Sequence, residues 1–241
     1  MLLTSSLPKK NLPPRPAGAP PGPPPPPGGA GNASAAPSAV LGGGSGIIFD
    51  NNSACSLTTI GHDGAGRLVG LTAGHCAPAG ARLIAEGTPS GGVIGTVAFS
   101  DNGEGLDYAV LQLDPERVTP VRSIGPTTIA GIGVPPGPGG TVCASGRTSG
   151  TDCGVVWGSL DGTSINQYCS KPGDSGGPVF VGDQLVGMNQ GRLTGIGPIG
   201  FDVPCTTAAN PVHSPAFFQP IAVILAAVNA QNGIGAGFQP I

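Results

Sequence analysis

The sequence predicts an all-β fold of two β halves followed by a C-terminal helix. From Gly46 onward, short β-branched runs are separated by glycine, asparagine and aspartate, which is typical of antiparallel strands joined by tight turns. A quieter stretch, residues 115–140, divides these runs into two groups. Helical periodicity occurs at residues 221–229, directly after Pro220. Because only 10% of the residues are charged, the composition favours a compact, turn-rich β-protein.

The strand-like runs justify the two halves one by one. The first group reads GIIFD, CSLTTIG, RLVGLTAG, ARLIAEG, GGVIGTVAFS and LDYAVLQLD, and the second reads GTVCASG, CGVVWGSL, GGPVFV and QLVGMNQG. Each run has the length of a strand and ends at, or directly before, a turn-forming residue. We therefore predict a first β half over residues 46–120, and a second β half with the helix over residues 121–230.

The two ends of the chain are predicted to lie outside these halves. Twelve of the 28 prolines precede residue 40, and proline fixes φ and supplies no N–H group. Such a stretch is PPII-like or disordered and serves best as a tether. We predict a disordered arm over residues 1–45 and a flexible tail over residues 231–241.

Charge and hydropathy exclude several classes of partner. The formal net charge is −3 and the basic residues are sparse, so nucleic acid is not an expected partner. The apolar stretch Pro220–Ala230 is too short to cross a bilayer. Residues 1–10 lack the apolar core of an export signal. We expect a monomer.

The cysteine count points to an oxidising compartment. The number is even and no C-x-x-C pair occurs, so three disulfides are favoured over a metal site, with 15 pairings open. A zinc site built from Cys55, His62, His75 and Cys76 would lack the usual ligand spacing. We predict a secreted or envelope protein without a cofactor or metal. The cysteines are Cys55, Cys76, Cys143, Cys153, Cys169 and Cys205.

One short segment, KPGDSGGPVF, places Ser175 between glycines on both sides. A serine hydroxyl reacts only when a base takes its proton and N–H donors receive the developing oxyanion. The flanking glycines allow a tight bend that brings backbone N–H groups close to a substrate carbonyl. The simpler interpretation is a glycine-rich turn, which a chain with this much glycine also contains elsewhere.

Two further motifs favour catalysis over that interpretation. LTAGHCAP places His75 at the end of one strand, and GLDYAVLQL places Asp107 at the start of another. A carboxylate that enters a buried strand needs a partner, and His75 is the natural one. Together the three motifs predict a base, an orienting acid and a nucleophile.

These motifs resemble the chymotrypsin-fold serine peptidases, in the order His, Asp, Ser. The resemblance spans residues 46–229 and is sharpest toward the bacterial branch that contains the streptogrisins and α-lytic protease. VCASGRTSGTDCG, CSKPGDSGGP and FFQPI carry this part of the resemblance. It implies two six-stranded antiparallel β-barrels with a C-terminal helix.

The resemblance also implies a division of labour. Ser175 attacks the peptide carbonyl, His75 accepts its proton, and Asp107 fixes the imidazole tautomer. The N–H groups of Gly173 and Ser175 form the oxyanion hole. The implied disulfides are Cys55–Cys76, Cys143–Cys153 and Cys169–Cys205.

A further implied feature is an ion pair between Arg147 and Asp174, the residue before the nucleophile. In the bacterial branch, such a pair holds the oxyanion loop in its active shape. No newly cut N-terminus would then be needed to assemble the site.

The segment expected to bind substrate, Gln190, Gly191 and Arg192, departs from the family pattern. Gln190 stands where the family has a serine that helps to hold the catalytic aspartate. Arg192 stands where a small residue lines the specificity pocket, so it either narrows the pocket, attracts an acidic P1 side chain, or points into solvent. A small or medium apolar P1 residue is our first expectation and an acidic one our second.

Two other functions remain open from the sequence. GDSGG also satisfies G-x-S-x-G, so an α/β-hydrolase could use Ser175, Asp202 and His213, although GGP followed by VFV opposes the required helix. Alternatively, the fold could be a binding module whose remodelled pocket is closed or weakly active. Our prediction is a serine endopeptidase with an acyl-enzyme intermediate.

Overall fold

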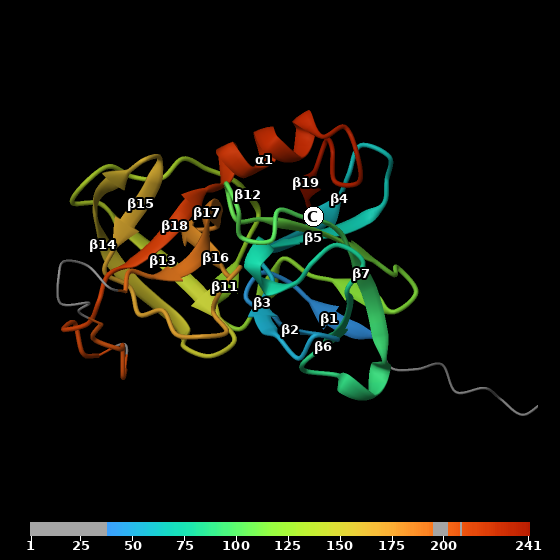
Figure 1. Ribbon diagram of the computed structural model, residues 1–241, viewed down its shortest axis with the longest axis horizontal. Helices are drawn as coiled ribbons and strands as arrows, with labels where there is room; N and C mark the ends of the chain where they lie inside the picture. Colours follow the sequence, from blue (N-terminus) through green and yellow to red (C-terminus); the bar gives the residue numbers. More distant parts are fainter. Residues whose placement is uncertain (1–37, 195–201, 208) are drawn as a thin grey trace, which may run out of the picture. The chain divides into compact units, whose positions relative to one another are not determined.

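The computed structural model describes residues 38–194, 202–207 and 209–241 and confirms the all-β prediction (Figure 1). These residues belong to one compact unit, Ala36–Ile241. Residues 1–37 of the predicted arm lie outside the described residues. Within the described ranges, no helix has the length and apolarity that crossing a bilayer requires.

The first half is an antiparallel sheet in the order β19-β4-β5-β8-β7-β6-β2-β3. Leu57 and Thr58 alone separate β3, one edge strand of this sheet, from β4, which lies next to the other edge strand, β19. By its hydrogen-bond ladders the sheet is open, whereas the resemblance implies a closed six-stranded barrel. Its strands are β2 (Gly46–Phe49), β3 (Ala54–Ser56), β4 (Thr59–His62), β5 (Leu68–Thr72), β6 (Arg82–Ala85), β7 (Val93–Ser100), β8 (Ala109–Leu113) and β19 (Gln239–Pro240).

The second half is the closed barrel that the resemblance implies. Its strands follow the order β17-β16-β13-β14-β15-β18, and β17 also pairs with β18, which closes the ring of six. The short β12 (Gly131–Ile132) adds to β17 in parallel. The ring consists of β13 (Thr141–Gly146), β14 (Gly150–Leu160), β15 (Thr163–Asn166), β16 (Pro178–Val181), β17 (Gln184–Arg192) and β18 (Ala216–Pro220).

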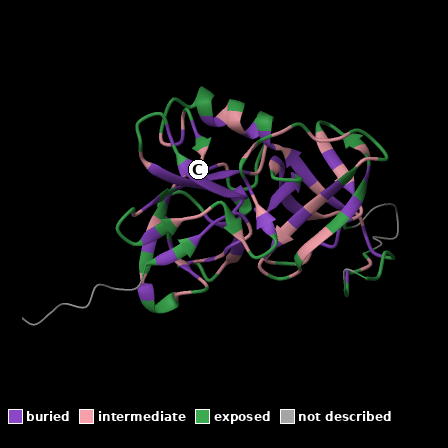
Figure 2. Cartoon of the chain, turned by 180° about the vertical axis from the view of Figure 1, so that it is seen from behind, coloured by how far each residue is buried: buried purple, intermediate pink, exposed green. Residues whose placement is uncertain are grey.

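The remaining elements connect and cover the two halves. The helix α1 (Ile221–Ala230) begins directly after Pro220, as predicted, and buries Ile221, Ile224 and Val228. Figure 2 shows that buried residues concentrate on the strands, while α1 exposes its outer face. The short elements are β1 (Ala39–Leu41), η1 (Gly74–Cys76), η2 (Pro89–Gly91), β9 (Val118–Pro120), β10 (Ser123–Ile124) and β11 (Thr127–Thr128).

Two predicted boundaries are wrong. The last residues of the arm, 39–45, are packed into the fold, because β1 pairs with β9 and buries Ala39 and Leu41. The flexible tail is also ordered: Phe238 is buried and β19 pairs with β4. Both ends gain backbone hydrogen bonds and apolar burial that composition alone does not reveal.

The apolar interior consists of two clusters of different size. The larger one fills the first half and continues to α1, with residues such as Leu71, Leu111 and Ile224. The smaller one lies in the second barrel and includes Val142 and the fully buried Tyr168. The larger cluster also reaches the second barrel through Phe180, Leu185 and Met188.

Candidate active site

Ser175 lies in the turn that leads into β16, between two glycines with left-handed backbone. Gly173 has φ of +99° and Gly176 has φ of +80°, conformations that side chains with a Cβ rarely adopt. A Cβ at Gly176 would also lie 2.6 Å from Ser56 O and 2.8 Å from Ala73 N. Gly176 is therefore required by a close approach of this turn to the first half.

His75 and Asp107 meet at one end of the first sheet. His75 lies in η1, just after β5, and Asp107 lies just before β8, the antiparallel neighbour of β5. His75 Nδ1 is 2.8 Å from Asp107 Oδ2, and the His75 N–H donates to Asp107 Oδ1 at 2.8 Å. The carboxylate thus places the imidazole proton on Nδ1 and leaves Nε2 as the basic nitrogen.

The same contacts alter the acidity of this corner. The hydrogen bond that the His75 ring donates to Asp107 raises the pKa of His75 above its ordinary value, although burial acts in the opposite direction. Burial raises the pKa of nearby Asp101, while the N–H groups of Gly103 and Tyr108 lower it and the charge of Asp107 adds to the rise. Asp101 accepts hydrogen bonds from those two N–H groups at 3.2 and 3.0 Å, so it holds the loop that presents Asp107.

Backbone contacts bring the Ser175 turn against the strand that leads to His75. The Ser56 N–H donates to Ser175 O at 2.8 Å, and the Thr72 hydroxyl donates to Ser56 O at 2.9 Å. The disulfide Cys55–Cys76 joins the neighbour of Ser56 to the neighbour of His75. The Ser175 turn is therefore linked through Ser56 to Thr72, and through Cys55–Cys76 to the residue next to His75, while the hydrogen bonds of the described residues include none between Ser175 Oγ and His75.

The predicted pair between Arg147 and Asp174 is replaced by other contacts. The Asp174 carboxylate accepts N–H groups of Thr148 and Ser149 at 2.9 Å each, and of Lys171 at 2.8 Å. The Arg147 guanidinium instead binds Glu86 of the first half, with Nε 2.7 Å from Oε2. Backbone donors thus satisfy the buried carboxylate, and the arginine is free to join the two halves.

The predicted oxyanion donors are available. Within the described ranges, the N–H groups of Gly173 and Ser175 donate to no protein acceptor. Both lie in the turn that the Asp174 contacts hold, on either side of that residue. The role of these two N–H groups as oxyanion donors stays a prediction.

Gln190 takes over part of the support that the family assigns to a serine. Its side-chain N–H donates to Leu106 O at 2.6 Å and to Asp107 O at 3.3 Å. Asp107 has φ of +54°, so an external donor that fixes its backbone stabilises an uncommon conformation. Gln190 therefore holds the backbone of the predicted acid.

A buried polar network that the sequence analysis did not identify lies behind the turn. Asn189 donates to Asp174 O at 2.9 Å and to Ser170 Oγ at 3.0 Å, and it accepts from the Tyr168 hydroxyl at 3.0 Å. Tyr168 is fully buried, which raises the pKa of its hydroxyl. The one available signal was an asparagine inside the apolar run QLVGMNQG.

Arg192 lies at the end of β17 and is already paired. Its Nε and Nη2 lie 2.9 and 3.0 Å from the two carboxylate oxygens of Asp202. Gly191 precedes it, and a Cβ there would meet only Phe217, at 3.8 Å. The Arg192 guanidinium is thus neutralised by the Asp202 carboxylate and does not point freely into solvent.

The alternative sites from the sequence are not assembled. Ser175 is followed by β16 and not by the helix that an α/β-hydrolase requires. Asp202 binds Arg192, and His213 Nδ1 lies 2.9 Å from Ser214 O.

Cys55, His75 and Cys76 lie close together, but both sulfurs are used in a disulfide. The pairings Cys143–Cys153 and Cys169–Cys205 also form, so all three implied disulfides are confirmed.

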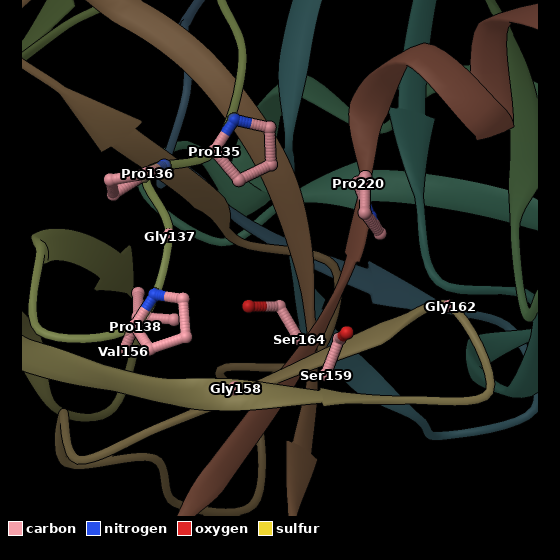
Figure 3. A pocket seen from close by; sticks show the side chains of 10 residues that line it. All are labelled: Pro135, Pro136, Gly137, Pro138, Val156, Gly158, Ser159, Gly162, Ser164 and Pro220. Atoms are coloured by element: carbon pink, nitrogen blue, oxygen red, sulfur yellow. The ribbon is translucent and has the colours of Figure 1, made fainter.

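A pocket of about 270 Å³ elsewhere on the second barrel has no such chemistry (Figure 3). Prolines of the PPGP segment and Pro220 surround it, and the Ser164 hydroxyl points into it. None of its lining residues is titratable. The candidate site is therefore formed around His75, Asp107 and the Ser175 turn, and not by this pocket.

Comparison with known proteins agrees with this geometry, although no protein-family model matches the chain. The chain is 35% identical over 136 residues to Serine protease 1 of Rarobacter faecitabidus, a match that covers 50% of this chain. It spans only 26% of that relative's length. It is also 35% identical over 63 residues to Streptogrisin-C of Streptomyces griseus, covering 22% of this chain and 14% of that protein.

Solved structures cover more of the chain. Thermobifida fusca protease A superimposes with a TM-score of 0.61 at 28% identity, and the match covers 84% of this chain and 99% of the protease. The agreement thus extends over both halves and the site between their loops. By sequence similarity and by fold, the chain is similar to bacterial chymotrypsin-fold serine peptidases, among them Streptogrisin-C and Thermobifida fusca protease A.

Proposed function

We propose that the chain is a serine endopeptidase that uses Ser175, His75 and Asp107. The observation that carries this proposal is the double hydrogen bond between His75 and Asp107, next to the strand against which the Ser175 turn is fixed. A carboxylate that orients an imidazole beside a serine is the arrangement that activates a hydroxyl for acyl transfer.

The proposed reaction has two steps. His75 Nε2 takes the Ser175 proton as Oγ attacks the peptide carbonyl, and the Gly173 and Ser175 N–H groups receive the oxyanion. His75 then gives its proton to the leaving amine, which leaves an acyl-enzyme. Water hydrolyses this ester by the same route, with His75 again acting as the base.

A covalent probe tests the proposal. An aryl fluorophosphonate should label the full chain at Ser175, and labelling should disappear in Ser175→Ala and His75→Ala because both remove the activated hydroxyl. His213→Ala is the matched control and should label like the wild type. An unreactive wild-type chain would favour the closed binding module, and loss of labelling in His213→Ala would favour the α/β-hydrolase.

Specificity follows from the Arg192–Asp202 pair. Because Asp202 neutralises the guanidinium, we expect an uncharged, small or medium apolar P1 residue. In Asp202→Ala the cation is released, so the ratio of kcat/KM for a P1 Glu peptide to that for a P1 Ala peptide should rise about tenfold. The double variant with Arg192→Ala should lose this gain. An unchanged ratio in Asp202→Ala would show that Arg192 does not contact the P1 side chain.

Location follows from the disulfides. Three disulfides in a chain of this size support a secreted or envelope-associated enzyme. Its activity should therefore be lost under reducing conditions that open Cys169–Cys205 beside the Ser175 loop.

A further inference from the structure

The turn between β13 and β14 lies against the loop that carries Ser175, and one of its hydroxyl groups contacts the peptide group before Gly173. Thr148 Oγ1 donates a hydrogen bond to Pro172 O at 2.9 Å. A Cβ at Gly173 would lie 2.5 Å from the same Oγ1. The Thr148 hydroxyl therefore touches the peptide group that joins Pro172 to Gly173.

That peptide group contains one of the two proposed oxyanion donors. The described residues have no cis peptide bond, so the Pro172 carbonyl and the Gly173 N–H point in opposite directions from one rigid plane. A bond that fixes the carbonyl therefore also fixes the direction of the N–H. Gly173 tolerates many backbone angles, so without this bond the plane could rotate.

The Thr148 hydroxyl is itself held by a charged group. Arg147 Nη1 donates to Thr148 Oγ1 at 3.4 Å, which leaves the hydroxyl proton for Pro172 O. The other guanidinium nitrogens bind Glu86. A side chain at Gly46 would collide with the Glu86 carboxylate, so the first half is shaped to admit this acid.

A second set of contacts keeps the turn in place without this hydroxyl. The Thr148 and Ser149 N–H groups bind Asp174 through the backbone, and Arg147 N donates to Ser56 Oγ, which in turn donates to Gly173 O. A substitution that removes only the Thr148 hydroxyl leaves all of these bonds possible. The effect of the hydroxyl can therefore be measured separately from the folding of the loop.

We infer that Thr148 is a positioning residue that fixes the Gly173 N–H as an oxyanion donor, with Arg147 and Glu86 holding its hydroxyl in place. The inference rests on the proposed peptidase function. Under this inference, Arg147 does not pair with Asp174 as expected. Instead, it orients the Thr148 hydroxyl.

The test compares Thr148→Val with Thr148→Ser in the full chain. Complete loss of one oxyanion donor lowers kcat by about 10²–10³, so a donor that is only less well oriented should lower it by about 10- to 100-fold. KM for a peptide substrate should change little, because the donor acts mainly on the transition state. Serine retains the hydroxyl and should restore most of kcat, which a purely structural role of the threonine methyl would not predict.

Controls separate the possible outcomes. Thr128→Val removes a hydroxyl that bonds Ser123 at 2.8 Å in a short hairpin, and it should leave kcat unchanged. If Thr148→Val does not fold, Thr148→Ala replaces it. A reactive wild type with unchanged kcat in Thr148→Val, or an equally slow Thr148→Ser, overturns this inference alone. A wild type that neither hydrolyses peptides nor reacts with the fluorophosphonate overturns the proposed function as well.

Discussion

The two halves of the described unit hold their reactive residues in different ways. In the first half, a side chain positions a side chain: Asp107 binds His75 through both carboxylate oxygens. In the second half, the backbone positions the proposed nucleophile: Ser175 sits between left-handed glycines in a loop whose bonds are mostly to N–H and C=O groups. We therefore expect substitutions that remove side-chain atoms to impair the site in the first half most. In the second half, substitutions that add atoms to the glycines should impair it most.

The largest expected effect comes from changing one atom of the side-chain pair. In Asp107→Asn an NH₂ group faces His75 Nδ1 or displaces the bond from the backbone N–H, so the imidazole adopts the wrong tautomer. The kcat should fall by about 10⁴, as it does for the equivalent change in serine peptidases, while the fold persists.

Steady-state kinetics and thermal unfolding check this prediction. Asp183→Asn, an exposed aspartate in the turn before β17, is the control and should retain full activity. An Asp107→Asn variant within tenfold of the wild type would mean that Asp107 does not orient the base.

Adding a methyl group to the Ser175 turn tests whether its backbone packing stabilises the second half. In Gly176→Ala the new Cβ collides with the Thr72 hydroxyl and lies 2.6 Å from Ser56 O, in a backbone conformation unfavourable for alanine. We expect a loss of about 3 kcal/mol in the free energy of unfolding, from overpacking and strain together. Urea unfolding measures it.

Gly182→Ala is the matched control. Gly182 also has a positive φ, +61°, but its Cβ would meet nothing within 4 Å. Only the conformational penalty of about 1 kcal/mol should remain. Equal losses in the two variants would show that the close approach of the Ser175 turn to Thr72 does not contribute.

The same difference explains what could be predicted from sequence. His75, Asp107 and Ser175 lie in short motifs whose neighbours create their local geometry, and the structure shows the predicted pairing of His75 with Asp107. The strands and α1 were predictable for the same reason, because their apolar periodicity is local.

Features that depend on distant contacts were not predictable. Arg147 meets Glu86, 61 positions away in the other half, while Asp174 is satisfied by backbone groups that have no sequence signature. The tail was misjudged for a similar reason: Phe238 is buried only because β19 finds an edge at β4, far away in the chain. Asn189 is a polar residue in an apolar run, and its partners become visible only once the barrel has closed.

The smallest expected effect is the pH dependence of the stability that His75 contributes to the first half. Asp107 raises the pKa of His75 in the folded state, mainly through the hydrogen bond to Nδ1, so the folded chain binds this proton more tightly than the unfolded chain. The stabilisation from His75 is then fully present below its unfolded pKa and is lost as pH rises through the folded pKa. Activity should move in the opposite direction, because the base must be neutral.

Two measurements over the same pH range test both trends, from about pH 5 to about pH 9. The difference in free energy of unfolding between the wild type and His75→Gln should shrink as pH rises, while wild-type kcat/KM should increase with a midpoint above the ordinary histidine pKa. Asp101 also lies near His75 and has a raised pKa, so Asp101→Asn should be measured alongside. A stability difference that grows with pH would mean that the His75–Asp107 bond favours the neutral imidazole. Asp107 would then not raise the pKa of His75.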